Sequence, residues 1–230
     1  MPLPALRLLE KKFEEHIRLF ELKRGALEKT IGNRIRRFEE RNGIRLDDEV
    51  RFIRSWIEKP LSIGAVTPSS RALARAMAAY VDPASRGPVI ELGPGTGPVT
   101  EALVTQGIDP ARLILVEFDP TFCRLLRERY PAATVVQGDA YSLKRVLGSQ
   151  LGEPAAAVVS GLPLFTKPLK TRLKLLYEAF ALMAPAAPFV QFTYATVPPI
   201  PKALDRVRSE ASERIWMNIP PARIWVYRKD

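Results

Sequence analysis

The sequence predicts an α/β fold built on a mostly parallel, doubly wound sheet with an antiparallel edge. Short runs of apolar and β-branched residues alternate along the chain with helical patterns, which is typical of such sheets. A glycine-rich turn directly follows the first of these runs, and the last two expected strands are consecutive. With 230 residues, 47% of them hydrophobic, the chain is long enough for one such domain and a modest extension.

The expected strands and helices follow one another from residue 47 onward. The strands are residues 89–92, 113–116, 134–137, 156–159 and 188–193, with two more within 214–227 that are joined at Pro220 and Pro221. Helices are expected at 47–59, 71–80 and 167–183. Another helix begins at Pro120 with Asp119 as its N-cap, and Cys123 within it is expected to be a small buried apolar residue.

Residues 1–45 form a separate compositional unit with a helical pattern. Apolar side chains recur there at spacings of three and four, and basic side chains occupy the remaining face. This pattern is typical of a helix that lies in a membrane interface, but a stripe that packs on the domain at 46–230 or on another subunit has the same spacing. The candidate membrane contacts are Leu6, Leu9, Lys12, Phe13, Ile17, Phe20 and Arg24.

Charge and hydropathy set bounds on the partners and the compartment. The net charge is +10, and the excess of basic residues lies in both flanks, outside residues 61–160. Such flanks suit nucleic acid or the anionic cytoplasmic leaflet. No apolar segment reaches the roughly 18 to 20 residues that span a bilayer, and the first residues mix charges instead of forming a signal-peptide core. We therefore expect a cytoplasmic protein that associates peripherally with a membrane, in an oligomeric state that the pattern does not specify.

Three glycines spaced two apart follow the first expected strand. The turn consists of Gly93, Pro94, Gly95, Thr96 and Gly97. The glycines remove side chains where the backbone must turn sharply and approach a ligand. A dinucleotide turn is written G-x-G-x-x-G, whereas here the third glycine falls one position early and Glu91 precedes the turn. This departure favours S-adenosylmethionine over a nicotinamide dinucleotide.

The later strands end in further candidate ligand contacts. Glu117 lies twenty positions beyond Gly97, where a nucleotide-binding fold places a carboxylate on ribose hydroxyls. Asp139 is placed to hydrogen-bond an adenine edge, or only to cap a helix. A polar loop before the first strand is well placed to close over a cofactor, and the loop at 160–165 is expected to face the transferred group. The remaining candidate cofactor contacts are Thr67, Phe118, Gly138, Ala140 and Ser160.

Five segments beyond the glycine turn resemble a known family. Residues 54–60, 64–69, 160–164, 191–194 and 218–225 are similar to segments of the bacterial phosphatidylethanolamine N-methyltransferases, within the class I S-adenosylmethionine-dependent methyltransferases. The resemblance implies a Rossmann-like sheet of seven strands and S-adenosylmethionine bound across residues 93–97, Glu117 and Asp139. It also implies an N-terminal amphipathic helix for membrane docking, and stepwise methylation of phosphatidylethanolamine toward phosphatidylcholine.

Methyl transfer to an amine requires chiefly that nucleophile, carbon and sulfur be aligned. Tyr141, Ser160 and Tyr194 are the candidates that hold or deprotonate the amine nitrogen. The candidate substrate contacts are Leu162, Pro163, Leu164 and Lys167. The candidate contacts of lipid phosphates, each of which could instead be solvated charge on a basic helix, are Lys167, Lys170, Arg172, Lys174 and Lys202. No metal ion is expected in the site.

Two alternative functions share part of this pattern. The ribosomal RNA adenine dimethyltransferases have the same glycine turn, but Ser160 replaces the amide of their fourth motif, and Leu164 stands where they carry a base-stacking ring. Phe165 follows one position later. The loss of the ring favours an aliphatic amine and makes nucleic acid an unlikely partner. The third hypothesis is a small-molecule methyltransferase whose N-terminal helix serves only in assembly.

Overall fold

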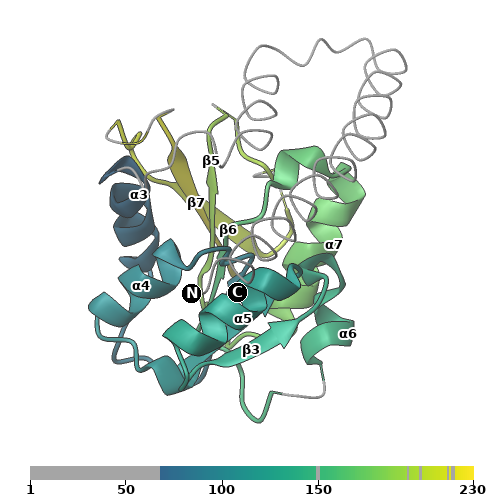
Figure 1. Cartoon of the computed structure of the whole chain (residues 1–230). Helices are drawn as coiled ribbons and strands as arrows, with labels where there is room; N and C mark the ends of the chain where they lie inside the picture. The colour runs from purple at the N-terminus through teal and green to yellow at the C-terminus, as the bar shows by residue number, and fades with distance from the viewer. Residues whose placement is uncertain (1–67, 149–150, 196, 202–203, 217, 219–220) are drawn as a thin grey trace, which may run out of the picture. The chain divides into compact units, whose positions relative to one another are not determined.

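The computed structural model describes residues 68–148, 151–195, 197–201, 204–216, 218 and 221–230 (Figure 1). Three expectations lie outside these residues: the docking segment at 1–45, the helix at 47–59, and Thr67. Side chains are described from Arg71 onward. Within the described residues, no helix is long and apolar enough to cross a bilayer.

Strands and helices alternate through most of the described chain. The first half contains α3 (Pro68–Ala78), β1 (Val89–Leu92), α4 (Pro98–Thr105), the 3₁₀ turn η1 (Pro110–Arg112), β2 (Leu113–Glu117) and α5 (Pro120–Arg129). Then come β3 (Thr134–Gln137), η2 (Ala140–Ser142), α6 (Leu143–Leu147), β4 (Ala157–Ser160), η3 (Leu164–Thr166) and α7 (Leu169–Phe180). The last elements are β5 (Phe189–Thr193), β6 (Val207–Ala211) and β7 (Arg223–Lys229).

The strands form one seven-stranded sheet in the order β3-β2-β1-β4-β5-β7-β6, which confirms the expected fold class. Strands β1 to β5 pair in parallel. Strand β7 runs antiparallel to both of its neighbours, so it lies one position inside the edge that β6 forms. The order reverses between β1 and β4, and a sheet of this kind binds its ligands at the carboxyl ends of the strands beside that point.

Two apolar layers cover the sheet (Figure 1). Helices α3, α4 and α5 contribute to the core on one face, and α6 and α7 to the core on the other. Strands β1 and β4 are buried along their whole length, as expected for central parallel strands. Their short apolar runs therefore have a direct cause, because both faces of each strand contact a helical layer.

The expected start of α5 is confirmed. Pro120 is its first residue, and the Asp119 side chain accepts hydrogen bonds from the amides of Thr121 and Phe122. Proline is favoured there because the first helical amide has no partner within the helix. Cys123 is fully buried in this helix, as expected.

The prediction of two strands within residues 214–227 is wrong for the first of them. Strand β6 lies upstream at Val207–Ala211, and residue Ile215 forms only an isolated bridge to Ala222 before β7 begins. Four of the five residues of β6 are exposed or half-buried, because it is an edge strand, so it lacks the apolar run that marks a buried strand. The expected helix at 167–183 is shorter, since α7 covers only Leu169–Phe180.

Candidate cofactor and substrate site

The carboxyl ends of β1 and β4 lie side by side and form the centre of the candidate site. Leu92 pairs with Ser160, and the Gly161 amide donates to the Leu92 carbonyl at 2.8 Å. A Cβ atom on Gly161 would lie 2.9 Å from the Gly93 carbonyl oxygen, so the two loops meet without room for a side chain. The glycine turn and residues 160–165, here called the β4 rim, are therefore direct neighbours.

The glycine turn leaves open space on one side. Gly93, Gly95 and Gly97 all have positive φ, at 68°, 57° and 87°. A Cβ on Gly97 would lie 3.2 Å from side chains of α5, whereas a Cβ on Gly95 would meet nothing within 4 Å. A ligand can thus approach the backbone at Gly95 with no side chain between them.

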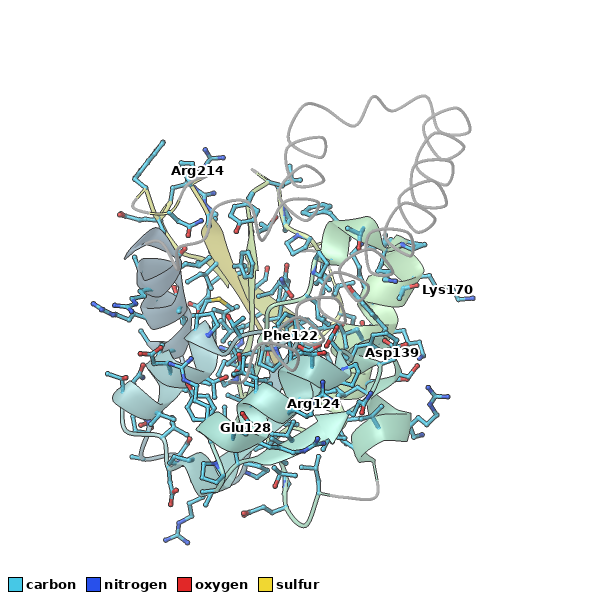
Figure 2. The ribbon with its side chains drawn as sticks, in the orientation of Figure 1. Phe122, Arg124, Glu128, Asp139, Lys170 and Arg214 are labelled. Carbon is cyan, nitrogen blue, oxygen red and sulfur yellow. The ribbon has the colours of Figure 1, made fainter. Side chains whose placement is uncertain are left out.

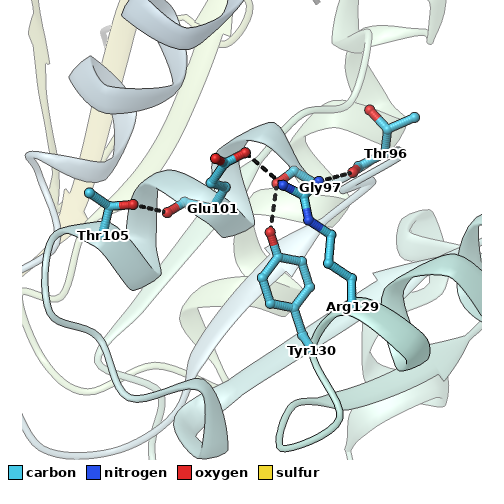
Figure 3. A network of polar contacts seen from close by, with 6 residues as sticks. All are labelled: Thr96, Gly97, Glu101, Thr105, Arg129 and Tyr130. Atoms are coloured by element: carbon cyan, nitrogen blue, oxygen red, sulfur yellow. Dashed lines mark hydrogen bonds and ion pairs between the residues drawn. The ribbon is translucent and has the colours of Figure 1, made fainter.

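Side chains at the end of α5 support the turn from its other side (Figure 3). Arg129 donates to the Thr96 carbonyl at 3.3 Å and to the Glu101 carboxylate at 2.8 Å. The Tyr130 hydroxyl donates to the Gly97 carbonyl at 3.4 Å. The sequence does not predict these contacts, because Arg129 and Tyr130 lie 28 to 33 positions from their partners and have no motif around them.

Glu117 ends β2 and joins it to the glycine turn. One carboxylate oxygen accepts from the Gly95 amide at 3.0 Å, and the other accepts from the amides of Phe118 and Asp119 at 2.7 and 2.9 Å. The residue is buried, which rules out the alternative that it is only an exposed acid at a strand end. A carboxylate has about four acceptor positions. Three are occupied, so Glu117 keeps capacity for a ribose hydroxyl.

Glu91 lies beneath the turn within β1. Its carboxylate accepts from the Thr100 hydroxyl at 2.7 Å, and the Thr100 backbone amide supports it as well. Burial, with a smaller effect of the nearby Glu117 charge, raises the pKa of Glu91, and the Thr100 hydrogen bonds lower it; the net result is a pKa of about 7. The carboxyl group thus fixes the start of α4 against β1.

Phe118 and Asp139 follow the ends of β2 and β3. The Phe118 ring is 74% exposed, which is unusual for a large apolar side chain and leaves a flat face for a partner. The Asp139 side chain accepts from the Tyr141 amide at 3.0 Å and so caps η2. A capping role is one of the two predictions for Asp139, beside a hydrogen bond to adenine. No hydrogen bond from the described residues occupies its other acceptor positions. Gly138 donates to the Glu117 carbonyl at 2.9 Å, which ties the β3 end to the β2 end, and Ala140 is buried behind it.

The β4 rim is joined to β5 by a buried amide side chain. Gln191 pairs with Ser160 in the sheet, and its Nε2 donates to the Leu162 carbonyl at 3.0 Å and to the Phe192 carbonyl at 2.7 Å. Its Oε1 is buried and has no hydrogen-bond partner among the described residues. Ser160 is fully buried, and its hydroxyl accepts from the Leu162 amide at 3.4 Å. In the sequence, Gln191 is only one residue of the resembling segment at 191–194, and no local pattern predicts its place beside the rim.

The remaining rim residues differ in exposure. Leu164 is only 2% exposed and packs in the α6–α7 core, whereas Leu162 is half-buried over Gly93 and Pro163 is exposed. Lys167 is exposed, with its ammonium 4.8 Å from the centroid of the Tyr141 ring. The contact of Lys167 at this end of the rim is therefore with the Tyr141 ring, while Leu164 anchors the rim in the core beneath it.

The two candidate tyrosines pack in opposite layers. Tyr141 belongs to the α6–α7 layer, where burial and the Asp139 charge raise its pKa, against the opposing effects of Arg172 and the Thr166 hydroxyl. Tyr194 packs on the other core, edge-on to Phe192 at 5.4 Å, and hydrogen-bonds with the Asn218 side chain. Burial raises the pKa of Tyr194 to about 12. Both phenols are therefore neutral at pH 7, and neither is a proton acceptor there.

The residues at the ends of β1, β2 and β3 fit S-adenosylmethionine. The open side of Gly95 accepts a ligand against bare backbone, and Glu117 keeps an acceptor for ribose. The exposed Phe118 ring offers a stacking face for adenine, and Asp139 lies at the neighbouring strand end. No metal ion is required by this set.

Comparison with known proteins agrees with this assignment. The chain is 34% identical over 145 residues to the ornithine lipid N-methyltransferase of Singulisphaera acidiphila, a match that covers 62% of this chain and 76% of the relative. It is 35% identical over 94 residues to ribosomal RNA small subunit methyltransferase A of a Synechococcus strain, but that match covers only 39% of this chain and 29% of the relative. No family model matches the chain.

Solved structures support the fold. The O-methyltransferase of Bacillus cereus, solved in complex with SAH, superposes with a TM-score of 0.54 over 84% of this chain and 96% of that one, at 12% identity. A likeness at this identity shows the architecture alone, and the family follows from the relative that is 34% identical. The chain belongs to the class I S-adenosylmethionine-dependent methyltransferases, in one family with the ornithine lipid N-methyltransferase, and its cofactor is S-adenosylmethionine.

Proposed function

We propose that this methyltransferase N-methylates the primary amine of a lipid headgroup, with phosphatidylethanolamine as the substrate and stepwise methylation toward phosphatidylcholine as the outcome. The observation that carries the proposal is the match over 76% of the length of a relative that is named as a lipid N-methyltransferase. That relative supports a lipid amine. The five resembling segments favour phosphatidylethanolamine over ornithine lipid.

The β4 rim has the groups that an amine substrate needs. S-adenosylmethionine supplies an electrophilic methyl group when bound. The buried Gln191 Oε1 lacks a donor among the described residues, and the Ser160 hydroxyl lies on the neighbouring strand end. A buried acceptor without a donor is costly, so an N–H group of the substrate is the natural partner for Gln191. In this role Gln191 and Ser160 orient the nitrogen.

Proton removal does not require a strong base in this arrangement. An amine must be neutral to attack, and burial against a positive sulfonium disfavours the ammonium form. The phenols of Tyr141 and Tyr194 stay protonated at pH 7, because burial raises both pKa values. These rings therefore act as hydrogen-bond donors or as cation–π faces for methylated amines instead of as bases.

RNA methylation is the second candidate, because the ribosomal RNA methyltransferase match includes part of the same domain. The rim favours the lipid. Leu164 is buried in the core, and the Phe165 ring is covered by the Arg172 guanidinium, whose Cζ lies 5.1 Å from the ring centroid. Leu164 has no ring, and one face of the Phe165 ring is already occupied, whereas base-modifying enzymes stack the target base on an aromatic face.

Labelled S-adenosylmethionine tests the proposal directly. The protein is incubated with phosphatidylethanolamine micelles, with ornithine lipid micelles, or with ribosomal RNA, and the label is followed into each product. We expect label in phosphatidylethanolamine and none in RNA. Label in ornithine lipid alone would show that the substrate is ornithine lipid and not phosphatidylethanolamine. Label in RNA alone would overturn the proposal of a lipid substrate.

We also propose that the protein binds the cytoplasmic face of the membrane through the apolar and basic stripe of residues 1–45. The sequence pattern supports this role, since apolar area and basic side chains both add to interfacial binding. Co-sedimentation with anionic vesicles tests it. Phe13→Glu and Phe20→Glu should release the protein from the vesicles. Trp216→Glu is the control and should not release it, because Trp216 is a 71% exposed aromatic residue outside residues 1–45. Equal release by all three variants would remove the docking role of the segment.

A further inference from the structure

Arg172 is a half-buried cation that forms no ion pair with an acidic side chain among the described residues. It lies in the first turns of α7, where one terminal nitrogen, Nη1, donates to the Pro199 carbonyl at 2.5 Å. Its Nε is buried and has no hydrogen-bond partner in the part of the chain that the structure describes. Burial lowers the pKa of the guanidinium. Nε belongs to the edge, shared with Nη2, that binds carboxylates and phosphates in bidentate fashion, and the described residues supply no acceptor to Nε.

A second cation lies in the same place. Tyr141, Phe165, Lys167 and Arg172 form what we call the Arg172 cluster. The Lys167 ammonium lies over the Tyr141 ring at 4.8 Å, and the Arg172 guanidinium lies over the Phe165 ring at 5.1 Å. Neither cation forms an ion pair with a carboxylate among the described residues, while Lys174 on the same helix pairs with Glu178 at 3.2 Å. Holding positive charge partly out of water without an anion costs free energy, so the cluster is suited to bind one.

The cluster adjoins the amine end of the rim. Phe165 and Lys167 follow Leu162 on the same short segment, and the Leu162 carbonyl is held by Gln191. Tyr141 lies in η2, directly after Asp139 and the end of β3, and Pro199 follows β5. The β4 rim therefore has an acceptor for an amine at one end and unpaired positive charge at the other.

We propose that Arg172 binds the anionic group of the lipid headgroup, phosphate or carboxylate, while Gln191 and Ser160 hold its amine. The inference rests on the proposed function, because it assigns a zwitterionic headgroup to the same site. Arg172 is a specificity residue in this scheme: it touches the substrate but not the reacting nitrogen. A neutral lipid amine would lack this contact.

Lys170 provides a matched control on the same helix. It lies two residues before Arg172, and Figure 2 shows it projecting outward from α7. The two residues have the same charge, but Lys170 is exposed and contacts none of the cluster. A general attraction of the helix to anionic surfaces would be reduced by either substitution, whereas a defined anion site needs Arg172 alone.

The test combines Arg172→Gln with a substrate that lacks the anion. Rates are measured in neutral detergent micelles for phosphatidylethanolamine, ornithine lipid, and an uncharged-linker lipid with a primary amine. Arg172→Gln should lower kcat/KM by about 10- to 100-fold for the zwitterionic lipid whose anionic group Arg172 binds, the loss typical of a hydrogen-bonded charge. It should leave kcat/KM for the neutral-linker amine unchanged, so that the enzyme no longer discriminates between the two. Lys170→Gln should change neither rate, and whichever of the two zwitterionic lipids loses activity identifies phosphate or carboxylate as the bound group.

Several outcomes would overturn the inference. An equal loss on the anionic and neutral substrates would show that Arg172 only supports the fold through Pro199, and no loss would show that it binds nothing. If Arg172→Gln does not fold, Arg172→Lys is measured in its place, together with the preference of the wild type for a zwitterionic lipid over the neutral-linker amine. A wild type without that preference contradicts the proposal. A wild type that binds S-adenosylhomocysteine but methylates none of the lipids defeats the proposed function, and the assignment of Arg172 with it. Methylation without a role for Arg172 defeats only this inference.

Discussion

The two halves of the site differ in how completely their own polar groups are paired. At the ends of β1 to β3, Glu117 accepts from three backbone amides, Glu91 accepts from Thr100, and Asp139 caps η2. At the end of β4 and the start of α7, Gln191 Oε1 and Arg172 Nε are buried without partners among the described residues. Each of the three carboxylates in the first half has a hydrogen-bond donor from the protein. In the second half, Gln191 Oε1 lacks a donor and Arg172 Nε lacks an acceptor among the described residues.

This difference separates two ways of building a binding site. The cofactor half is held by backbone amides and by α5, so it is already in its binding geometry and loses little freedom when the ligand enters. The substrate half leaves desolvated polar groups whose pairing depends on the incoming molecule. Such groups discriminate strongly, because a molecule that cannot pair them leaves their desolvation uncompensated. Each prediction below affects one half and should leave the other unchanged.

The largest effect is expected from Gly95→Val. Its side chain would occupy the open side of the turn, where the cofactor is expected, and S-adenosylhomocysteine binding should fall below detection by calorimetry. Positive φ at a residue with a side chain also costs about 1–3 kcal/mol. Gly107→Val is the control, since Gly107 has φ 106° and a Cβ there meets only Pro83, at 3.8 Å. Retained affinity in Gly95→Val would place the cofactor elsewhere.

A smaller effect on the same half is expected from Glu117→Gln. The amide group would place a donor against at least one of the three backbone donors and remove the charge. We expect S-adenosylhomocysteine affinity to fall about 10- to 100-fold. Asp109→Asn is the control, because Asp109 also accepts from a backbone amide, at 2.9 Å, but lies before β2 and not after it. Equal affinities in wild type and Glu117→Gln would remove Glu117 from the cofactor site.

In the substrate half, Gln191→Met should lower kcat/KM for the lipid by about 10-fold. Methionine has a similar size but has no amide oxygen that could accept a hydrogen bond from the amine. Calorimetry should find unchanged affinity for S-adenosylhomocysteine. Thr193→Val provides the control: Thr193 is buried on the same face of β5, and its hydroxyl accepts only from Ala195, at 3.0 Å. If Gln191→Met weakened cofactor binding instead, the division of the site would fail.

The smallest effect on ligand binding is expected from Glu91, which instead affects folding stability. Burial raises its pKa to about 7 in the folded protein, above the value of 4.5 without the fold, so the folded state binds more protons between these values. This contribution to stability is complete below pH 4.5 and is lost as the pH rises through 7, up to about 3 kcal/mol. Glu91→Gln keeps the acceptor for Thr100 and does not titrate. Its melting temperature should therefore fall less than that of wild type between pH 5 and pH 8, and identical slopes would contradict the burial argument.

The same contrast explains which parts the sequence could predict. The bounds of β1 and β3 agree with the expectation, and Glu117 lies beside the glycine turn, because strand, turn and acid follow one another at short spacing. The sequence predicts Arg172 as one of five basic residues that either contact lipid phosphates or are solvated charge, and it does not separate Arg172 from Lys170. Gln191 looked like one residue of a buried strand. Their importance depends on Pro199 and Leu162, 27 and 29 positions away, and no local pattern records such contacts. Strand β6 was missed for a related reason, since its pairing with β7 is backbone pairing and its side chains are mostly polar.

Initial rates with both substrates varied test the central claim most directly. For wild type, Glu117→Gln and Arg172→Gln, methyl transfer is measured across a range of S-adenosylmethionine and of phosphatidylethanolamine concentrations. The account predicts that Glu117→Gln raises KM for S-adenosylmethionine alone and that Arg172→Gln raises KM for the lipid alone. Both variants raising the same constant, or a wild type that binds S-adenosylhomocysteine and leaves the lipid unmethylated, would contradict it.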